Sequence, residues 1–182
     1  MFYGCFSLKK LDLSNFNTSK LASFHRIFDH CEPLEELNIS NFYTTGITNM
    51  DWTFCCCYSL GKLNLSNFDT SNVVNFSAMF YGCKALKELE ISNFDASKAT
   101  RMDKMFFNCE SLKELDLSNY ITNNVEDYCD MFHGCTALAK LNLGKLNSEK
   151  NANMKGMLGK CSDELKNQMR NQYKNIKDEA FI

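Results

Sequence analysis

The sequence predicts an α/β solenoid, in which short strands stack into a parallel sheet and short helices lie on the other side. Three observations lead to this expectation. Cysteines and leucines recur every 26 residues through most of the 182-residue chain. Apolar residues alternate in one part of each repeat, as they do in a strand with one buried face. In another part they follow the spacing of a helix.

The repeat is defined by a column of cysteines, where a column is the set of equivalent positions in successive repeats. Seven of the ten cysteines form it without insertion or deletion: Cys5, Cys31, Cys57, Cys83, Cys109, Cys135 and Cys161. Leucine columns follow three and six residues after each of the first six. A unit this small cannot bury its own apolar residues, so the units must stack into one continuous array.

Each repeat is expected to contain one short strand, in the segment L-x-L-S-N. In the third repeat, Leu63 and Leu65 would point inward and Asn64 outward. The next polar column would bond turn backbone groups where each strand ends: Asn15, Asn41, Asn67, Asn93 and Asn119. The aromatic column after it is expected to stack inside the solenoid: Phe16, Phe42, Phe68, Phe94 and Tyr120.

A short helix is expected later in each repeat. The apolar residues Val73, Phe76, Met79 and Phe80 have helical spacing. Glycine just past the last helical residue is a common stop, which predicts helix ends near Gly4, Gly82 and Gly134. One unit would then consist of a strand, a turn, a short helix and a second turn.

Residues 162–182 depart from the repeat and predict a C-terminal capping helix. Ser162 suits the N-cap position, and the acidic residues after it suit the first turn. One apolar stripe is formed by Leu165, Met169, Tyr173 and Ile176. Repeat arrays need caps, which favours this interpretation over a helix that binds a partner or a membrane surface. The predicted organisation is a solenoid in residues 1–161 and a cap in residues 162–182.

The first residues, Met1 to Cys5, repeat the middle of the unit found at Met79 to Cys83. The chain therefore begins inside the pattern, and its N-terminus is expected to lack a cap. This predicts that a longer natural protein, with a signal and further repeats, continues upstream, or that its start codon was assigned too late.

The run C-x-x-L-x-x-L-x-[LI]-S-N-F, followed by M-F-x-G-C, resembles the BspA-like leucine-rich repeats, in particular the 26-residue bacterial surface protein repeat. The resemblance covers residues 1–161. It implies a leucine-rich-repeat solenoid, a location at the cell surface or in secretion, and adhesion to a protein or glycoprotein partner. The matching positions are scaffold residues and specify no ligand. The alternative is a cytoplasmic structural scaffold without an external ligand.

The outward face of the strands is the candidate partner-binding surface, because solenoids commonly bind through this extended face. One candidate column lies between the strand leucines: Asp12, Asn38, Asn64, Glu90, Asp116 and Asn142. A flanking column adds Lys62, Glu88 and Glu114. The alternative is a solvated face of mixed charge, since no aromatic cluster that could act as a hot spot lies there.

The cysteines allow several chemical interpretations. Neighbouring column cysteines would lie close enough for disulfides, but seven cannot pair completely, and buried free thiols are the favoured interpretation. Cys55 and Cys56 precede the column residue Cys57, and His30 occupies the same position as Cys56 one repeat earlier. A metal or redox site there is disfavoured because the spacing is not C-x-x-C. The simpler interpretation is substitution in a variable turn.

No catalytic, cofactor or metal site is predicted. The three histidines have no nucleophile and orienting acid paired with them by sequence, so the chain is expected not to be an enzyme. The net charge of −2 argues against a nucleic-acid partner. No run of 18 or more apolar residues predicts a membrane span. We expect a monomer.

Overall fold

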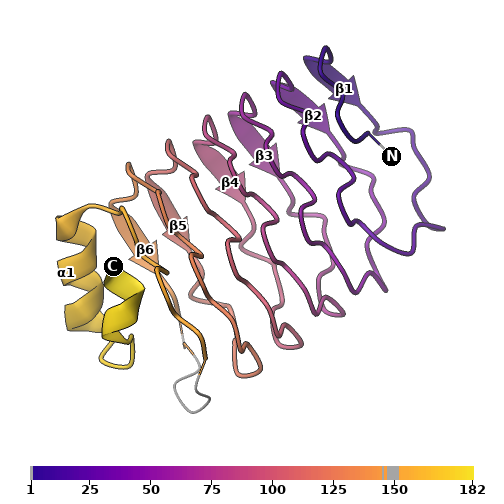
Figure 1. Cartoon of the computed structure of the whole chain (residues 1–182). Helices are drawn as coiled ribbons and strands as arrows, with labels where there is room; N and C mark the ends of the chain where they lie inside the picture. Colours follow the sequence, from indigo (N-terminus) through magenta and orange to yellow (C-terminus); the bar gives the residue numbers. More distant parts are fainter. Residues whose placement is uncertain (1, 145, 147–151) are drawn as a thin grey trace.

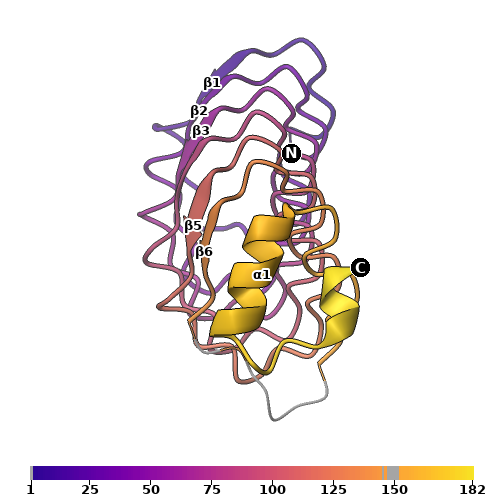
Figure 2. The same cartoon turned by 90° about the vertical axis from the view of Figure 1, so that its left-hand side faces the viewer.

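A computed structural model describes residues 2–144, 146 and 152–182 of the chain. Successive repeats form coils stacked in chain order, with the strands along one side and a C-terminal helix beside the last coil (Figure 1). The view along the array shows the strands on one side and the turns of each coil on the other (Figure 2). Residues 1, 145 and 147–151, which belong to the predicted solenoid, lie outside the described residues.

Each of the six described strands is three residues long. They are β1 (Lys10–Asp12), β2 (Glu36–Asn38), β3 (Lys62–Asn64), β4 (Glu88–Glu90), β5 (Glu114–Asp116) and β6 (Lys140–Asn142). All pairings are parallel, but hydrogen bonds join the strands only as β1–β2, β3–β4 and β5–β6. The expected continuous sheet is therefore divided into three sheets. Strands this short form few ladder bonds, so a small shift between coils ends the pairing.

The burial pattern of the strands agrees with the sequence. Each strand exposes its two outer residues and buries its central leucine at least in part. In β3, Leu63 is buried, as is Leu65 just after the strand, while Asn64 is exposed. The strand side thus presents two polar columns to solvent and keeps the leucine columns in the core.

The prediction of short helices on the other side is wrong for the described residues, where consecutive turns take their place. In the third coil the Phe76 amide donates to the Arg101 carbonyl of the next coil at 3.0 Å, while the Met79 amide donates to the Phe76 carbonyl at 3.2 Å. Ala78 and Gly82 have φ values of 53° and 72°. A left-handed residue at every fourth position cannot continue an α-helix. Gly4 and Gly134 likewise occupy left-handed turn positions, not helix ends.

The residues predicted to be buried by that spacing are nevertheless buried. Val73, Phe76, Met79 and Phe80 are fully enclosed. On this turn side, parallel bridges connect each coil to the next through Asn49, Asn75, Arg101, Asp127 and Asn153. The turns therefore carry a more continuous backbone ladder than the strands.

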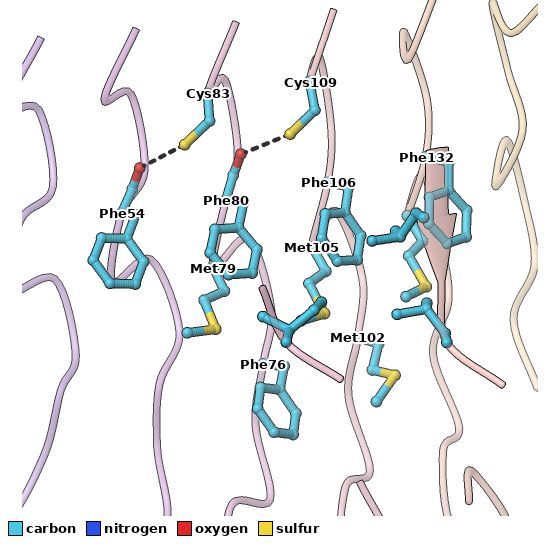
Figure 3. Close-up of a cluster of buried hydrophobic side chains, with 14 of the residues drawn as sticks. Phe54, Phe76, Met79, Phe80, Cys83, Met102, Met105, Phe106, Cys109 and Phe132 are labelled. Carbon is cyan, nitrogen blue, oxygen red and sulfur yellow. Dashed lines mark hydrogen bonds between the residues drawn. The ribbon is translucent and has the colours of Figure 1, made fainter. Parts of the chain in front are cut away.

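The cysteine column runs beside a column of stacked phenylalanines in the core. The Sγ of Cys83 donates to the Phe54 carbonyl at 3.1 Å, and the Sγ of Cys109 donates to the Phe80 carbonyl at 3.2 Å (Figure 3). The Phe54 and Phe80 rings lie 5.7 Å apart and are nearly parallel. All described cysteines are free thiols. The column thus acts as a set of small buried residues with one weak donor each.

The aromatic column after the strands behaves only partly as expected. Phe42, Phe68, Phe94 and Tyr120 are buried, but Phe16 is 49% exposed. Phe94 and Tyr120 stack at 6.4 Å, whereas the longer stack is formed by Phe2, Phe28, Phe54, Phe80, Phe106 and Phe132. Three members of the asparagine column, Asn41, Asn67 and Asn93, donate to backbone carbonyls as expected, Asn93 to that of Phe68 at 2.8 Å.

The C-terminal residues form α1 (Asp163–Gln172) and a short 3₁₀ helix, η1 (Asp178–Phe181). The Ser162 side chain accepts the Leu165 amide, as the sequence predicted for an N-cap. The Tyr173 hydroxyl accepts the amide of Leu143, next to β6, at 2.9 Å, and the Ala180 carbonyl accepts the Leu158 amide at 2.7 Å. One repeat earlier, the equivalent amides of Leu117 and Phe132 donate to carbonyls of the following coil. The C-terminal segment therefore supplies acceptors in place of a further repeat.

Candidate binding face

The strand side is hollowed next to α1. A groove of about 580 Å³ is lined by β4, β5, β6 and the outward face of α1; we call it the β4–β6 groove. Its acidic residues are Glu90, Glu114 and Asp116, and its one basic residue is Lys140. A second hollow, of about 370 Å³, continues toward β3 and shares Glu90 and Glu114 with the first.

The structure brings most of the predicted site residues to these two hollows. Glu90, Asp116, Asn142 and Glu114 line the groove. Lys62, Asn64 and Glu88 line the second hollow. Asp12 and Asn38 lie on the same side of the array, on β1 and β2, but line neither hollow.

The column between the strand leucines has a structural role that the sequence analysis did not assign. Its side chains accept the amide two residues later, at the point where each strand ends. Asp116 accepts the Ser118 amide at 2.8 Å, and Asn64 accepts the Ser66 amide at 2.9 Å. Glu90 accepts both the amide and the hydroxyl of Ser92. These residues therefore fix strand ends as well as facing the solvent.

These hydrogen bonds also set the charge on the column. The Ser92 hydroxyl and amide hold the pKa of Glu90 below its ordinary value. The Ser14 amide does the same for the pKa of Asp12. Both carboxylates are therefore ionised throughout the neutral range. The groove presents fixed negative charge at neutral pH.

The flanking column forms ion pairs within the hydrogen-bonded strand pairs. Lys62 and Glu88 lie 2.6 Å apart, and this contact raises the pKa of Lys62. Lys140 and Glu114 lie 3.5 Å apart, with both side chains more than two-thirds exposed. Exposed pairs of this kind contribute little to stability. Their charges remain accessible to a partner.

The sequence did not predict that residues of α1 line one side of the groove. This wall consists of Gln168 and Gln172. The Tyr173 hydroxyl, which accepts from Gln172 at 3.2 Å, also donates to Asn142 at 3.0 Å and so ties this wall to β6. The only signal in the sequence was the amphipathic pattern of residues 162–182, which predicts that one face of the helix stays exposed.

Cys55 and Cys56 lie in the consecutive turns, at the repeat positions of Tyr81 and Gly82, and both are buried, while Cys57 belongs to the core column. His30 lies beside them, as its repeat position predicted, and its amide donates to the Cys55 carbonyl at 2.8 Å. These residues are on the turn side of the first and second coils, away from the groove.

Over the described part of the chain, no helix is long and apolar enough to cross a membrane. None of the curated proteins compared with the chain matches it. Among solved structures, the chain is similar to the crystal structure of a leucine-rich-repeat protein from T. pallidum. The identity is 21% and the TM-score is 0.53, and the match covers 94% of this chain and 73% of the other. This likeness supports the predicted leucine-rich-repeat solenoid, while the narrower BspA-like assignment stays a resemblance.

One family model matches the sequence, in two overlapping segments. The matched residues are 1–64 and 48–172, so the two segments together span nearly the whole array and α1. The chain therefore belongs to the family described as Mycoplasma protein of unknown function, DUF285.

Proposed function

We propose that this chain is a non-catalytic protein-interaction solenoid that binds its partner through the β4–β6 groove. The groove itself carries the proposal, because it is the larger of the two strand-side hollows and is walled by α1. The leucine-rich-repeat-like fold also suggests an interaction role, since solenoids use such extended faces for binding.

The charges of the groove favour one class of partner segment. Glu90, Glu114 and Asp116 contribute three negative charges, against one positive charge from Lys140. A complementary segment is extended, polar and rich in lysine or arginine. The glutamines of α1 and Asn142 offer neutral donors and acceptors beside these charges.

We further propose that the protein acts at the cell surface, as part of an adhesin-like protein. The resemblance of the 26-residue repeat to bacterial surface repeats supports this location. The alternative remains a cytoplasmic scaffold of the same fold, whose strand side has no external ligand.

The test uses a variant that removes charge and keeps shape. Glu90→Gln, Glu114→Gln and Asp116→Asn together form the neutral-groove variant. The amide oxygens of the new side chains can still accept the Ser92 and Ser118 amides, as Asn64 does for Ser66. Its melting temperature should equal that of the parent. A plain charge reversal at Asp116 would instead disturb a strand end as well as the groove.

Binding is measured against immobilised matrix and plasma proteins at two salt concentrations. The account predicts saturable, salt-sensitive binding that the neutral-groove variant weakens by about tenfold or more. A control variant, Glu35→Gln with Glu110→Gln and Glu164→Gln, removes the same charge outside the groove and should bind like the parent. Equal binding by the parent and the neutral-groove variant would exclude the groove, and no binding at all would favour the scaffold.

A further inference from the structure

Two successive coils place four side chains with metal-binding chemistry in one block on the turn side. Asp29 and His30 come from the first coil, and Cys55 and Cys56 occupy the same two columns in the second. One ligand atom each from His30, Cys55 and Cys56 lies within 4.8 Å of the other two. The Cys55 and Cys56 sulfurs are 3.4 Å apart. We propose that His30, Cys55 and Cys56 form a binding site for a divalent transition-metal ion, with Zn²⁺ as the probe.

The spacing of these atoms suits one shared ion. Two sulfurs bound to a tetrahedral zinc ion at about 2.3 Å each lie about 3.8 Å from one another. The observed sulfur separation is slightly shorter, and one ligand atom of the imidazole lies within 4.8 Å of both sulfurs. The His30 side chain is 39% exposed, which leaves a path from solvent to the two buried sulfurs.

Asp29 supplies the outer part of the site. Its side chain is 1% exposed, and its Oδ1 lies 2.6 Å from His30 Nδ1. A carboxylate that holds the second nitrogen of a metal-binding histidine is a recurring arrangement. Its other oxygen, Oδ2, is buried without a hydrogen-bond partner, and Arg26 Nε lies 3.7 Å from it. With two thiolates, Asp29 and Arg26, a divalent cation would bring the formal charge of the block to zero.

His30 and Cys56 belong to a column in which every described member has a positive φ, with values of 59° and 57° for these two. Glycine fills this position at Gly4, Gly82 and Gly134. Because glycine adopts this conformation without a steric cost, it is the matched replacement for His30 and for Cys56.

The test uses the full chain, purified metal-free under reducing conditions. Zn²⁺ affinity is measured by competition with a chromogenic chelator, and Co²⁺ is added to a second sample to detect thiolate-to-cobalt charge transfer. We expect one Zn²⁺ per chain, a thiolate–cobalt band, and a melting temperature that rises with Zn²⁺.

The decisive variant restores the residues found one repeat later: Cys55→Tyr with Cys56→Gly, as at Tyr81 and Gly82. It should lower Zn²⁺ affinity by more than about 100-fold and remove the cobalt band. His30→Gly, which matches Gly4 and Gly82, should lower the affinity by about tenfold or more and keep a weaker band. The melting temperature of each variant is also measured without metal, because Cys55→Tyr places a large ring at a buried position and His30→Gly removes the partner of Asp29 Oδ1.

Cys129→Ser serves as the thiol control, because Cys129 lies three coils beyond Cys55 and Cys56 and outside the cysteine column. It should keep the stoichiometry, the band and the affinity of the parent. Zn²⁺ binding that is absent in the parent, or equal in the parent and the Cys55→Tyr, Cys56→Gly variant, would overturn the proposal.

Discussion

At the residue scale, the contacts of the cysteine column explain why cysteine, and not another small residue, recurs at this core position. Each described sulfur from Cys31 onward lies 3.0 to 3.2 Å from the carbonyl of a phenylalanine in the preceding coil. Alanine would fill less space and offer no donor, and serine would bury a more polar group. A thiol fills the space and donates one weak hydrogen bond, with a smaller desolvation cost than a hydroxyl.

The column predicts loss of stability at alkaline pH. Burial raises the pKa of Cys31 to about 11 and holds the pKa values of Cys57, Cys83 and Cys109 well above the ordinary value of a thiol. Thiols in the unfolded chain have a pKa of about 8.5. The folded state thus holds these protons more tightly, so its stability is complete below that value and falls as the pH rises toward the folded values. Each thiol contributes about 1.4 kcal/mol of loss per pH unit.

Urea unfolding at pH 7 and at pH 9.5 measures this effect. The free energy of unfolding should fall steeply in the parent, and Cys83→Ala should reduce the fall by the share of one thiol. A free energy that is constant between the two pH values would contradict the burial of the column.

The left-handed positions predict a stabilising substitution. Lys104 has a φ of 57°, so Lys104→Gly removes a steric cost of about 1 kcal/mol, partly offset by the greater freedom of glycine in the unfolded chain. The melting temperature should rise slightly. Lys113→Gly, outside the left-handed positions, is the matched control and should lower it. A fall of equal size in both variants would argue against the turn conformation.

Which side chains are buried could be read from the sequence, but which backbone conformation buries them could not. Consecutive turns repeat every three to four residues, as a helix does, so Val73, Phe76 and Met79 carry the same pattern in both. The left-handed positions were hidden because Ala78 and Lys104 stand where glycine would have marked them. The convergence of His30 with Cys55 and Cys56 was visible as a shared column, but the burial of the sulfurs was not.

At the element scale, the last strand shows how the array ends. The Leu143 amide follows β6, and it donates to the Tyr173 hydroxyl where Leu117 donates to the next coil. Leu165 and Met169 of α1 are buried against the same end of the core. These contacts support the proposal that residues 162–182 cap the solenoid. The amphipathic pattern of the sequence predicted the helix, but only the structure shows that the Tyr173 hydroxyl accepts the Leu143 amide.

If residues 162–182 cap the solenoid, removing the Tyr173 hydroxyl oxygen alone should lower the stability of the chain. Tyr173→Phe removes the acceptor of the Leu143 amide and should lower the free energy of unfolding by about 1 to 3 kcal/mol. Tyr43→Phe, at an exposed ring, is the control and should have almost no effect. Urea unfolding of both variants provides the comparison. Equal stability of the two would mean that the hydroxyl is not needed at the end of the array.

At the scale of the whole molecule, stability comes from contacts between neighbouring coils, so the end of the array matters to all of it. Deletion of residues 162–182 would expose the last coil, leaving the Leu143 and Leu158 amides without their acceptors. We expect the truncated chain to melt earlier or to aggregate, as measured by thermal unfolding and light scattering. A truncated chain as stable and monomeric as the parent would contradict the capping role.

The two sides of the solenoid differ in their structural roles. The turn side carries the continuous backbone ladder, which leaves the strand side to vary its exposed columns from coil to coil. The scaffold columns were predictable because they repeat. The groove was not, because it depends on where α1 lies beside β4, β5 and β6.

The most direct test of the binding face is selection of peptides from a random displayed library, with the parent chain and the neutral-groove variant as separate targets. Lysine- or arginine-rich peptides should be enriched on the parent and not on the variant, and their binding should protect β4–β6 from hydrogen exchange. Enrichment of the same peptides on both targets, or protection confined to the turn side, would contradict it.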